Sequence, residues 1–225
     1  MDSSQTKERI ARIYGIKMNI VLIGKNGSGK GTLASILKEK YRIPHISTGE
    51  IFREARDKET DLGKKVKRYL DRSELVPDEI TIEVVKDRLK KRDCKKGYIL
   101  DGFPRTVEQA EALETITTID AALVLDVSDK VIIERLANRY LCKPCNIIYG
   151  LNNPPKKKYL CDKCEEKLYQ REDDKPTNVN KRLKIFTKQF EPMINYYLNQ
   201  GKMHLINGER KPEQVLEEVV EILGK

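Results

Sequence analysis

A glycine-rich stretch near the start of the chain has the residue types and spacing that bind phosphate. Residues 24–32, GKNGSGKGT, follow the apolar run 19–23 and precede helically spaced apolar residues in 33–41. Glycines allow successive N–H groups to point inward, and the start of a helix adds its positive end. Lys30 would then reach the β- and γ-phosphates of a nucleotide. We therefore predict that the phosphates of a donor nucleotide contact Gly27, Ser28, Gly29, Lys30, Gly31 and Thr32.

A second stretch with chemical potential is GYILDGFPRT, residues 97–106. Its apolar part reads as a short strand that ends in Asp101, where a carboxylate would orient Mg²⁺ or its waters at the carboxyl edge of a sheet. Arg105 follows on a loop stiffened by Pro104, which suits bidentate binding of a phosphate. Taken alone, Asp-Gly-Phe-Pro is an ordinary turn, but downstream of a phosphate-binding loop it indicates a site.

Four cysteines form two knuckles. Cys142 and Cys145, then Cys161 and Cys164, are each separated by two residues, which is typical of a zinc site. Four thiolates close the tetrahedral coordination of Zn²⁺, so the predicted metal is structural. Disulfides are the competing interpretation, but an intracellular nucleotide enzyme lies where thiols stay reduced. The fifth cysteine, Cys94, has no partner nearby in the sequence, and we expect an ordinary thiol.

The elements that must position these residues alternate between strands and helices. Apolar runs predict strands at 19–23, near 45, at about 97–101, at 120–127 and at 203–206, and helices are expected between them. A helix over 130–139 would place Arg135 and Arg139 on one face, because they are four residues apart. Pro77 suits the first position of a helix. The pattern predicts an α/β fold of the P-loop NTPase type, with a five-stranded parallel sheet and helices on both faces.

Composition limits the function classes. The 225 residues suit one α/β domain, and the net charge of +9 favours polyanionic partners such as nucleic acid, acidic membranes or nucleotides. Trp is absent and aromatic residues are few, which disfavours a base-stacking platform for single strands. No apolar run is long enough to span a membrane. Residues 1–17 include Asp2 and Glu8, so we expect a short surface extension rather than a transit peptide.

From residue 18 to about 223 the chain resembles the adenylate kinases of the long-lid type. The blocks that carry the resemblance are the glycine loop, ISTGE at 46–50, LDGFPRT at 100–106 and LYQREDD at 168–174. The resemblance implies reversible transfer between MgATP and AMP, with Mg²⁺ and a structural Zn²⁺ as metals. It also implies a core of residues 18–46, 77–137 and 175–225, an AMP-binding flap at 47–76 and a zinc-binding lid at 138–174.

The resemblance assigns roles that local patterns leave open. Arg139, Arg171 and Arg182 would join Lys30 and Arg105 as catalytic residues around the phosphoryl groups, with no general base. On the donor side it adds Arg135, Arg139, Ile148, Tyr149 and Arg210. To the AMP site it assigns Thr48, Arg53, Glu74, Leu75, Val76, Gly102, Phe103, Pro104, Arg105, Gln109, Arg171 and Arg182.

The chain departs from the family pattern at four positions. Asn26 replaces the usual loop proline, Leu33 a common Gln, Tyr140 a frequent second Arg, and Gly150 a typical His. Asn tolerates unusual backbone angles, so we expect the phosphate loop to form.

Two other functions are alternatives to adenylate kinase. A UMP or CMP kinase is disfavoured by Thr48 and Gln109, and a nucleic-acid-binding zinc-knuckle NTPase should bind DNA or RNA in a strongly salt-dependent way. We expect a cytoplasmic monomer that binds ATP, AMP and ADP, and neither nucleic acid nor membranes.

Overall fold

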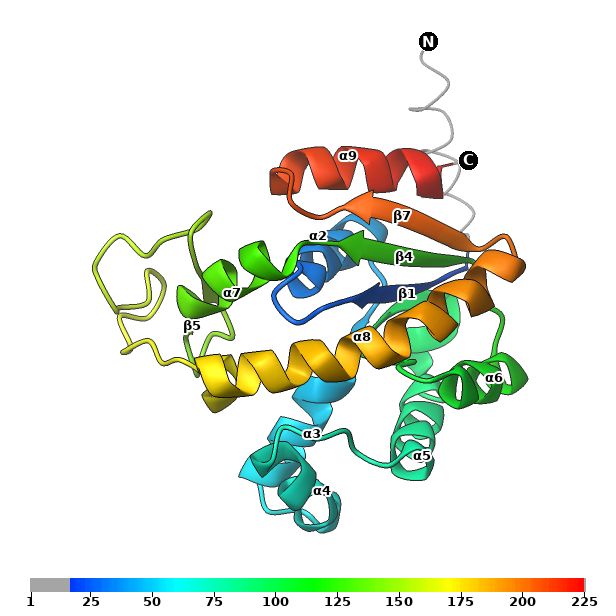
Figure 1. Cartoon of the computed structure of the whole chain (residues 1–225), viewed down its shortest axis with the longest axis horizontal. Coiled ribbons are helices and arrows are strands. Elements are labelled where there is room, and N and C mark those ends of the chain that lie inside the picture. The colour runs from blue at the N-terminus through cyan, green and yellow to red at the C-terminus, as the bar shows by residue number, and fades with distance from the viewer. Residues whose placement is uncertain (1–16, 225) are drawn as a thin grey trace.

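The computed structural model describes residues 17–224, apart from the side chains at 189 and 190. The predicted extension, residues 1–17, lies outside this part of the chain except for Lys17. The elements, in chain order, are β1 (Met18–Gly24), α2 (Lys30–Tyr41), β2 (His45–Ser47), α3 (Thr48–Asp57), α4 (Asp61–Asp71), α5 (Asp78–Leu89), the 3₁₀ helix η1 (Arg92–Lys96), β3 (Gly97–Asp101), α6 (Val107–Ile116), β4 (Ala121–Asp126), α7 (Asp129–Ala137), β5 (Tyr140–Leu141), β6 (Ile148–Tyr149), the 3₁₀ helix η2 (Glu172–Asp174), α8 (Pro176–Asn199), β7 (Met203–Asn207) and α9 (Pro212–Leu223) (Figure 1).

The central sheet has five parallel strands, as predicted, and their order is β2-β3-β1-β4-β7. The register places Leu22 opposite Asp101, and Ser47 opposite Asp101 from the other side. Because all strands run the same way, the glycine loop after β1 and the ends of β2 and β3 meet at one edge. The topology therefore brings the predicted phosphate-binding loop and Asp101, the predicted Mg²⁺-orienting residue, to the same edge of the sheet.

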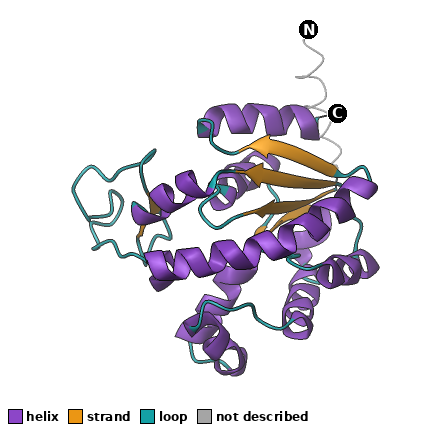
Figure 2. Ribbon diagram, viewed as in Figure 1, coloured by secondary structure: helices purple, strands orange, loops and turns teal. Residues whose placement is uncertain are grey.

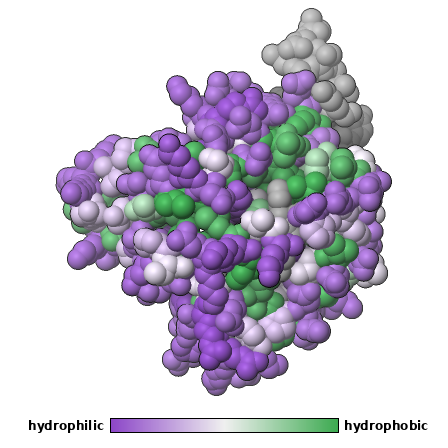
Figure 3. All heavy atoms as spheres, in the orientation of Figure 1, coloured by the Kyte–Doolittle hydropathy of each residue, from purple (hydrophilic) through white to green (hydrophobic). Residues whose placement is uncertain are grey.

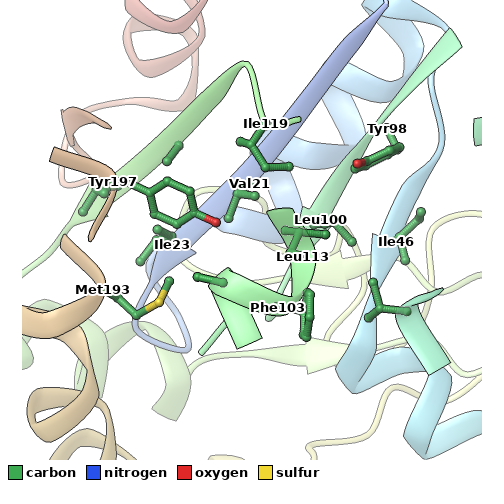
Figure 4. Close-up of a cluster of buried hydrophobic side chains, with 14 of the residues drawn as sticks. Val21, Ile23, Ile46, Tyr98, Leu100, Phe103, Leu113, Ile119, Met193 and Tyr197 are labelled. Atoms are coloured by element: carbon green, nitrogen blue, oxygen red, sulfur yellow. The ribbon is translucent and has the colours of Figure 1, made fainter. Parts of the chain in front are cut away.

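Apolar residues cover both faces of the sheet because parallel strands are buried on both sides. In β1, Val21 and Ile23 point to one face, where they pack with Leu100, Met193 and Tyr197 (Figure 4). The alternate β1 residues, Ile20 and Leu22, pack on the other face in a cluster with side chains of α2 and α9 that includes Leu33, Leu37, Val215 and Val219. The two clusters fix the strands whose carboxyl ends carry the site.

The segment predicted as the flap consists of α3 and α4, which extend from the sheet at the bottom of Figure 1. Phe52, Val66 and Val76 form a small core, against which Ile80 and Val84 of α5 also pack. At Gly63 a side chain would not fit, since a Cβ there would lie 2.0 Å from the carbonyl oxygen of Ala55. Close backbone contact therefore joins α3 to α4.

The segment predicted as the lid has very little regular structure. It contains the short pair β5 and β6 and, at its end, the 3₁₀ helix η2, and most of it is drawn as loop (Figure 2). Hydrophilic side chains cover most of the visible face of the molecule, most densely over the flap (Figure 3). No helix within residues 17–224 is both long enough and apolar enough to cross a membrane.

Two local predictions were wrong. Helix α7 ends at Ala137, so Arg139 follows the helix instead of sharing its face with Arg135. Asn138 ends the helix, and β5 begins at Tyr140, which leaves Arg139 on the connection between them. Pro77 occupies the N-cap position of α5 rather than its first turn.

Candidate active site

A cleft of about 580 Å³ opens at the carboxyl edge of the sheet. It is lined by the glycine loop, the flap, the loop between β3 and α6, the end of α7 and part of the lid. Every residue that the sequence predicted to contact ATP, AMP or Mg²⁺ lines this cleft, with the exception of Phe103. Phe103 is fully buried in the core beneath the loop, so its side chain supports the site without facing it.

The glycine loop has the geometry that phosphate binding requires. Gly27 and Gly29 have φ angles of 87° and 99°, which favour glycine, and Gly29 directly precedes the first residue of α2. Lys30 is buried, and its Nζ donates hydrogen bonds to the carbonyl oxygens of Gly24 at 2.7 Å and Lys25 at 2.8 Å. Burial lowers the pKa of Lys30 to about 8, and the charges of neighbouring arginines add to this effect. The loop therefore holds a cation that an anionic ligand would stabilise.

Asp101 lies at the end of β3 and lines the same cleft as Lys30, with which it interacts electrostatically. His45, the first residue of β2, has its Nε2 3.4 Å from Oδ2 of Asp101. Burial alone would raise the pKa of Asp101, but the His45 contact and the charge of Lys30 outweigh it, so the pKa is lowered. The side chain is thus an ionised carboxylate at neutral pH, which is the donor that Mg²⁺ prefers.

Five arginines surround this floor, and we call them the arginine cluster: Arg53, Arg105, Arg139, Arg171 and Arg182. Two are held by a pair of aspartates in η2. Arg139 donates from Nε to Asp174 at 2.8 Å and from Nη2 to the other carboxylate oxygen. Arg182 donates to Asp173 at 3.0 Å.

The other three arginines of the cluster lack an acidic partner at hydrogen-bond distance within residues 17–224. Arg105 donates from Nε to the carbonyl oxygen of Gly102 at 2.8 Å, and Nε of Arg171 is buried without a partner. Burial and the charge of Arg171 lower the pKa of Arg53 to about 10. Burial also lowers the pKa of Arg105. Partly buried cations without matching anions are costly, so the cluster is suited to several phosphate charges at once.

At one end of the cleft, neutral polar groups lie beside Arg105. Thr48 is buried and donates its hydroxyl to the carbonyl oxygen of Gly102 at 2.9 Å. Nearby, Gln109 accepts a hydrogen bond from the backbone N–H of Arg105 at 2.8 Å and donates to Asp78 at 2.7 Å. Such groups suit recognition of an uncharged base next to a phosphate.

The opposite end of the cleft is formed by α7, the lid and the loop after β7. Arg135 extends from α7 and donates to the carbonyl oxygen of Ser28 at 3.4 Å, while Arg210 pairs with Glu218. Ile148 and Tyr149 reach the cleft from the lid. Of the four departures from the family pattern, Tyr140 is the one that does not line the cleft; it stacks edge-on against Tyr159 instead.

The four knuckle cysteines converge in the lid, and we call them the cysteine cluster. All four Sγ atoms lie within 4.8 Å of one another. Two disulfides would not require all four to meet, whereas one tetrahedral metal ion would. Cys142 and Cys161 are 1% exposed and pack with Tyr149 and Leu168, so the cluster is the centre of the lid. The donor set fits Zn²⁺.

Comparison with known proteins places this geometry in a family. The family model described as adenylate kinase matches residues 22–202. The chain is 46% identical to the adenylate kinase of Clostridium tetani over 213 residues, which cover 92% of this chain and 99% of that protein. It is 48% identical over 212 residues to the protein of the same name from Staphylococcus epidermidis, with the same coverage, and 47% identical over 213 residues to that of Caldicellulosiruptor bescii, also covering 92% and 99%.

The chain belongs to the adenylate kinase family. The expected fold class and family are thereby confirmed. Membership in this family also fits a cleft that has a phosphate-binding loop at its centre and different side chains at its two ends.

Sequence reasoning missed three aspartates that position the site. Asp173 and Asp174 hold Arg182 and Arg139, and Asp78 holds Gln109. The first two stood inside a block that carries the family resemblance, LYQREDD, yet received no role. Asp78 stands in the first turn of a helix, where an acidic residue has an ordinary explanation in the helix dipole. No local pattern marks it as a partner of a glutamine 31 residues away.

Proposed function

We propose that this member of the family catalyses reversible phosphoryl transfer from MgATP to AMP, giving two ADP. The observation that carries the proposal is one continuous cleft in which the glycine loop and the arginine cluster lie between a neutral acceptor end and a donor end. A nucleoside triphosphate on the loop and a monophosphate at Thr48 and Gln109 would direct their phosphates to the same cations. An NTPase that used water as acceptor would have no need for the second end.

The proposed chemistry requires alignment and charge neutralisation rather than a base. An oxygen of the AMP phosphate attacks the γ-phosphorus of ATP, and the bond to the bridging oxygen breaks, so that both products are ADP. Negative charge spreads over the oxygens of the transferring group, and Lys30 with the arginine cluster offsets it. Asp101 and Thr32 would hold Mg²⁺, which when bound neutralises charge on the donor phosphates.

We propose that the flap closes over AMP and the lid over ATP. Closure would exclude water, because hydrolysis competes with transfer whenever water reaches the γ-phosphate. Both segments line the cleft, since Glu74, Leu75 and Val76 reach it from the flap and Ile148 and Tyr149 from the lid. The proposed boundaries are 47–76 for the flap and 138–174 for the lid.

The cysteine cluster would hold one structural Zn²⁺, which fixes the fold of the lid. Four thiolates leave no position open for substrate, so the metal would take no part in transfer. Five free thiols suit a reducing compartment, and we propose that the protein acts in the cytoplasm. We propose a monomer, since one chain supplies both ends of the cleft.

A coupled assay with MgATP and each of AMP, CMP, UMP and GMP tests the proposal. We expect AMP to be the preferred acceptor by at least about tenfold in kcat/KM, and two ADP to form per turnover. A preference for UMP or CMP would move the chain to the pyrimidine kinases. Hydrolysis of ATP without any acceptor dependence would contradict the proposal.

A further inference from the structure

The side chain of Gln109 is held by two hydrogen bonds whose direction is chemically fixed. Its Oε1 accepts from the backbone N–H of Arg105 at 2.8 Å, and its Nε2 donates to Oδ1 of Asp78 at 2.7 Å. A backbone N–H only donates and an ionised carboxylate only accepts. If the amide were flipped, Nε2 would face the N–H and Oε1 would face the carboxylate. Asp78 and Arg105 therefore permit one orientation of this amide.

Asp78 is itself anchored between two helices. It lies in the first turn of α5, and its Oδ2 accepts a hydrogen bond from the hydroxyl of Thr106 at 2.7 Å. Thr106 is the N-cap residue of α6, where its hydroxyl also accepts from the backbone N–H of Gln109 at 3.2 Å. The carboxylate is thus fixed by the start of one helix and aimed at a residue in the first turn of the next.

The two bonds leave part of the amide available to a ligand. Within the described residues they are the only hydrogen bonds of the Gln109 side chain, so Oε1 keeps one lone pair and Nε2 keeps one hydrogen. The residue lines the cleft at its acceptor end. It presents an acceptor and a donor side by side in a fixed order.

We propose that Asp78 is a specificity-determining positioning residue, which selects 6-aminopurine over 6-oxopurine monophosphates by fixing the orientation of the Gln109 amide. Adenine offers an amino donor at position 6 beside a ring-nitrogen acceptor, which matches the free Oε1 and Nε2–H. Hypoxanthine and guanine have a carbonyl at position 6, which would face Oε1 and be repelled. A glutamine free to flip would accept either base.

This inference rests on the proposed function, because it places the acceptor base at Gln109. The probes are AMP and inosine monophosphate, which differ at position 6 and in the protonation of the adjacent ring nitrogen but share the same sugar and phosphate. The measured quantity is the ratio of kcat/KM for AMP to kcat/KM for inosine monophosphate. A purely structural contribution of Asp78 would affect both acceptors equally and leave this ratio unchanged.

The principal variant is Asp78→Ala, for which we expect the ratio to fall by about tenfold or more while the KM for MgATP stays the same. Asp78→Asn keeps an oxygen that can accept from Gln109, so it should retain most of the discrimination. Glu79→Ala is the matched control, because Glu79 is an exposed acid in the same first turn of α5, and removing it should leave the ratio unchanged.

The outcomes separate this inference from the proposed function. A wild-type protein that prefers AMP, together with an Asp78→Ala variant that keeps the full preference, overturns the role of Asp78 alone. Lower thermal stability of Asp78→Ala with an unchanged ratio has the same meaning, since it would leave Asp78 with only a structural role. A wild-type protein that does not phosphorylate AMP at all contradicts the proposed function itself.

Discussion

The arginine cluster and the cysteine cluster are two concentrations of polar side chains that are satisfied in opposite ways. The cysteine cluster brings four thiols within 4.8 Å of one another, and one Zn²⁺ would complete it without any further partner. The arginine cluster gathers partly buried cations, and Arg53 forms no hydrogen bond or ion pair within the described residues. One cluster is complete once its metal binds, and the other is complete only when a substrate binds.

This difference indicates which cluster serves stability and which serves chemistry. Burial lowers the pKa of Lys30 to about 8 and the pKa values of Arg53 and Arg182 to about 10, so the folded protein disfavours charges that it nevertheless keeps. Such an electrostatic cost is retained where the binding of an anionic ligand offsets it. The lid has a polar composition, almost no helix or strand and only a small apolar cluster around the cysteines, so a bound metal would hold it together.

The largest expected effect is on turnover when a cation of the cleft floor is removed. Lys30→Met or Arg105→Ala should lower kcat by at least about a hundredfold, because each removes charge that offsets the transition state. Steady-state kinetics in the direction of ADP formation provide the measurement. Lys38→Met, at the exposed end of the same helix, is the control and should keep its activity. Near-normal turnover in either cleft variant would remove that residue from the catalytic set.

For the cysteine cluster we expect a clear effect on thermal stability and a modest effect on turnover. We predict about one zinc per chain, and Cys164→Ser should lower the thermal midpoint clearly but kcat only modestly. Structural zinc contributes about 10–16 kcal/mol in isolated peptides, although here much of that would fold the lid alone. The measurements are elemental analysis and calorimetric unfolding.

The fifth cysteine provides the control for the metal experiment. Cys94 is buried in the core and lies outside the cysteine cluster, so Cys94→Ser should leave the zinc content unchanged. Absence of zinc from freshly purified, reduced protein would refute the metal site. A Cys164→Ser variant that keeps its thermal midpoint and loses its chemistry would refute the division of roles.

A smaller effect, on nucleotide affinity, is expected when the pH is raised. Above pH 8 Lys30 is neutral in the free protein, so a bound phosphate must draw a proton onto it, and nucleotide affinity should fall by up to about tenfold per pH unit. Stability should change in the opposite direction. Because folding lowers the pKa of Lys30 from 10.5, its charge opposes folding below pH 8, and this opposition fades between pH 8 and 10.5.

Calorimetric titration with a non-hydrolysable ATP analogue between pH 7.5 and 9.5 would measure this decline in affinity. The Lys30→Met variant should bind weakly with no slope over the same range. An equal slope in wild type and variant would assign the titration to another group.

The fold was predictable because its signals are local. Continuous apolar runs marked the strands, the glycine loop marked the first strand-to-helix turn, and cysteine spacing marked the centre of the lid. Arg139 shows the limit of such signals. The sequence predicted a helix that reaches Arg139, whereas α7 ends at Ala137. Its contact with Asp174, 35 residues away, is a tertiary one that no local spacing contains.

The site was predictable where it depends on a motif and not where it depends on packing. Nearly all predicted substrate residues line one cleft, but Phe103 turns into the core because a large apolar side chain is more stable there. Asp78 was overlooked because its role depends on α5 and α6 lying side by side. The sequence of either helix alone contains no sign of that.

The most direct test of the account compares the unfolding of Arg53→Met with that of wild type, with and without AMP. Methionine fills a similar space without the partly buried charge, so the free variant should melt at the same temperature or higher, and AMP should raise its midpoint far less than that of wild type. This result would show that the cation is kept for the substrate at the expense of stability. A free variant that melts several degrees lower, and is still stabilised by AMP as strongly as wild type, would contradict the account.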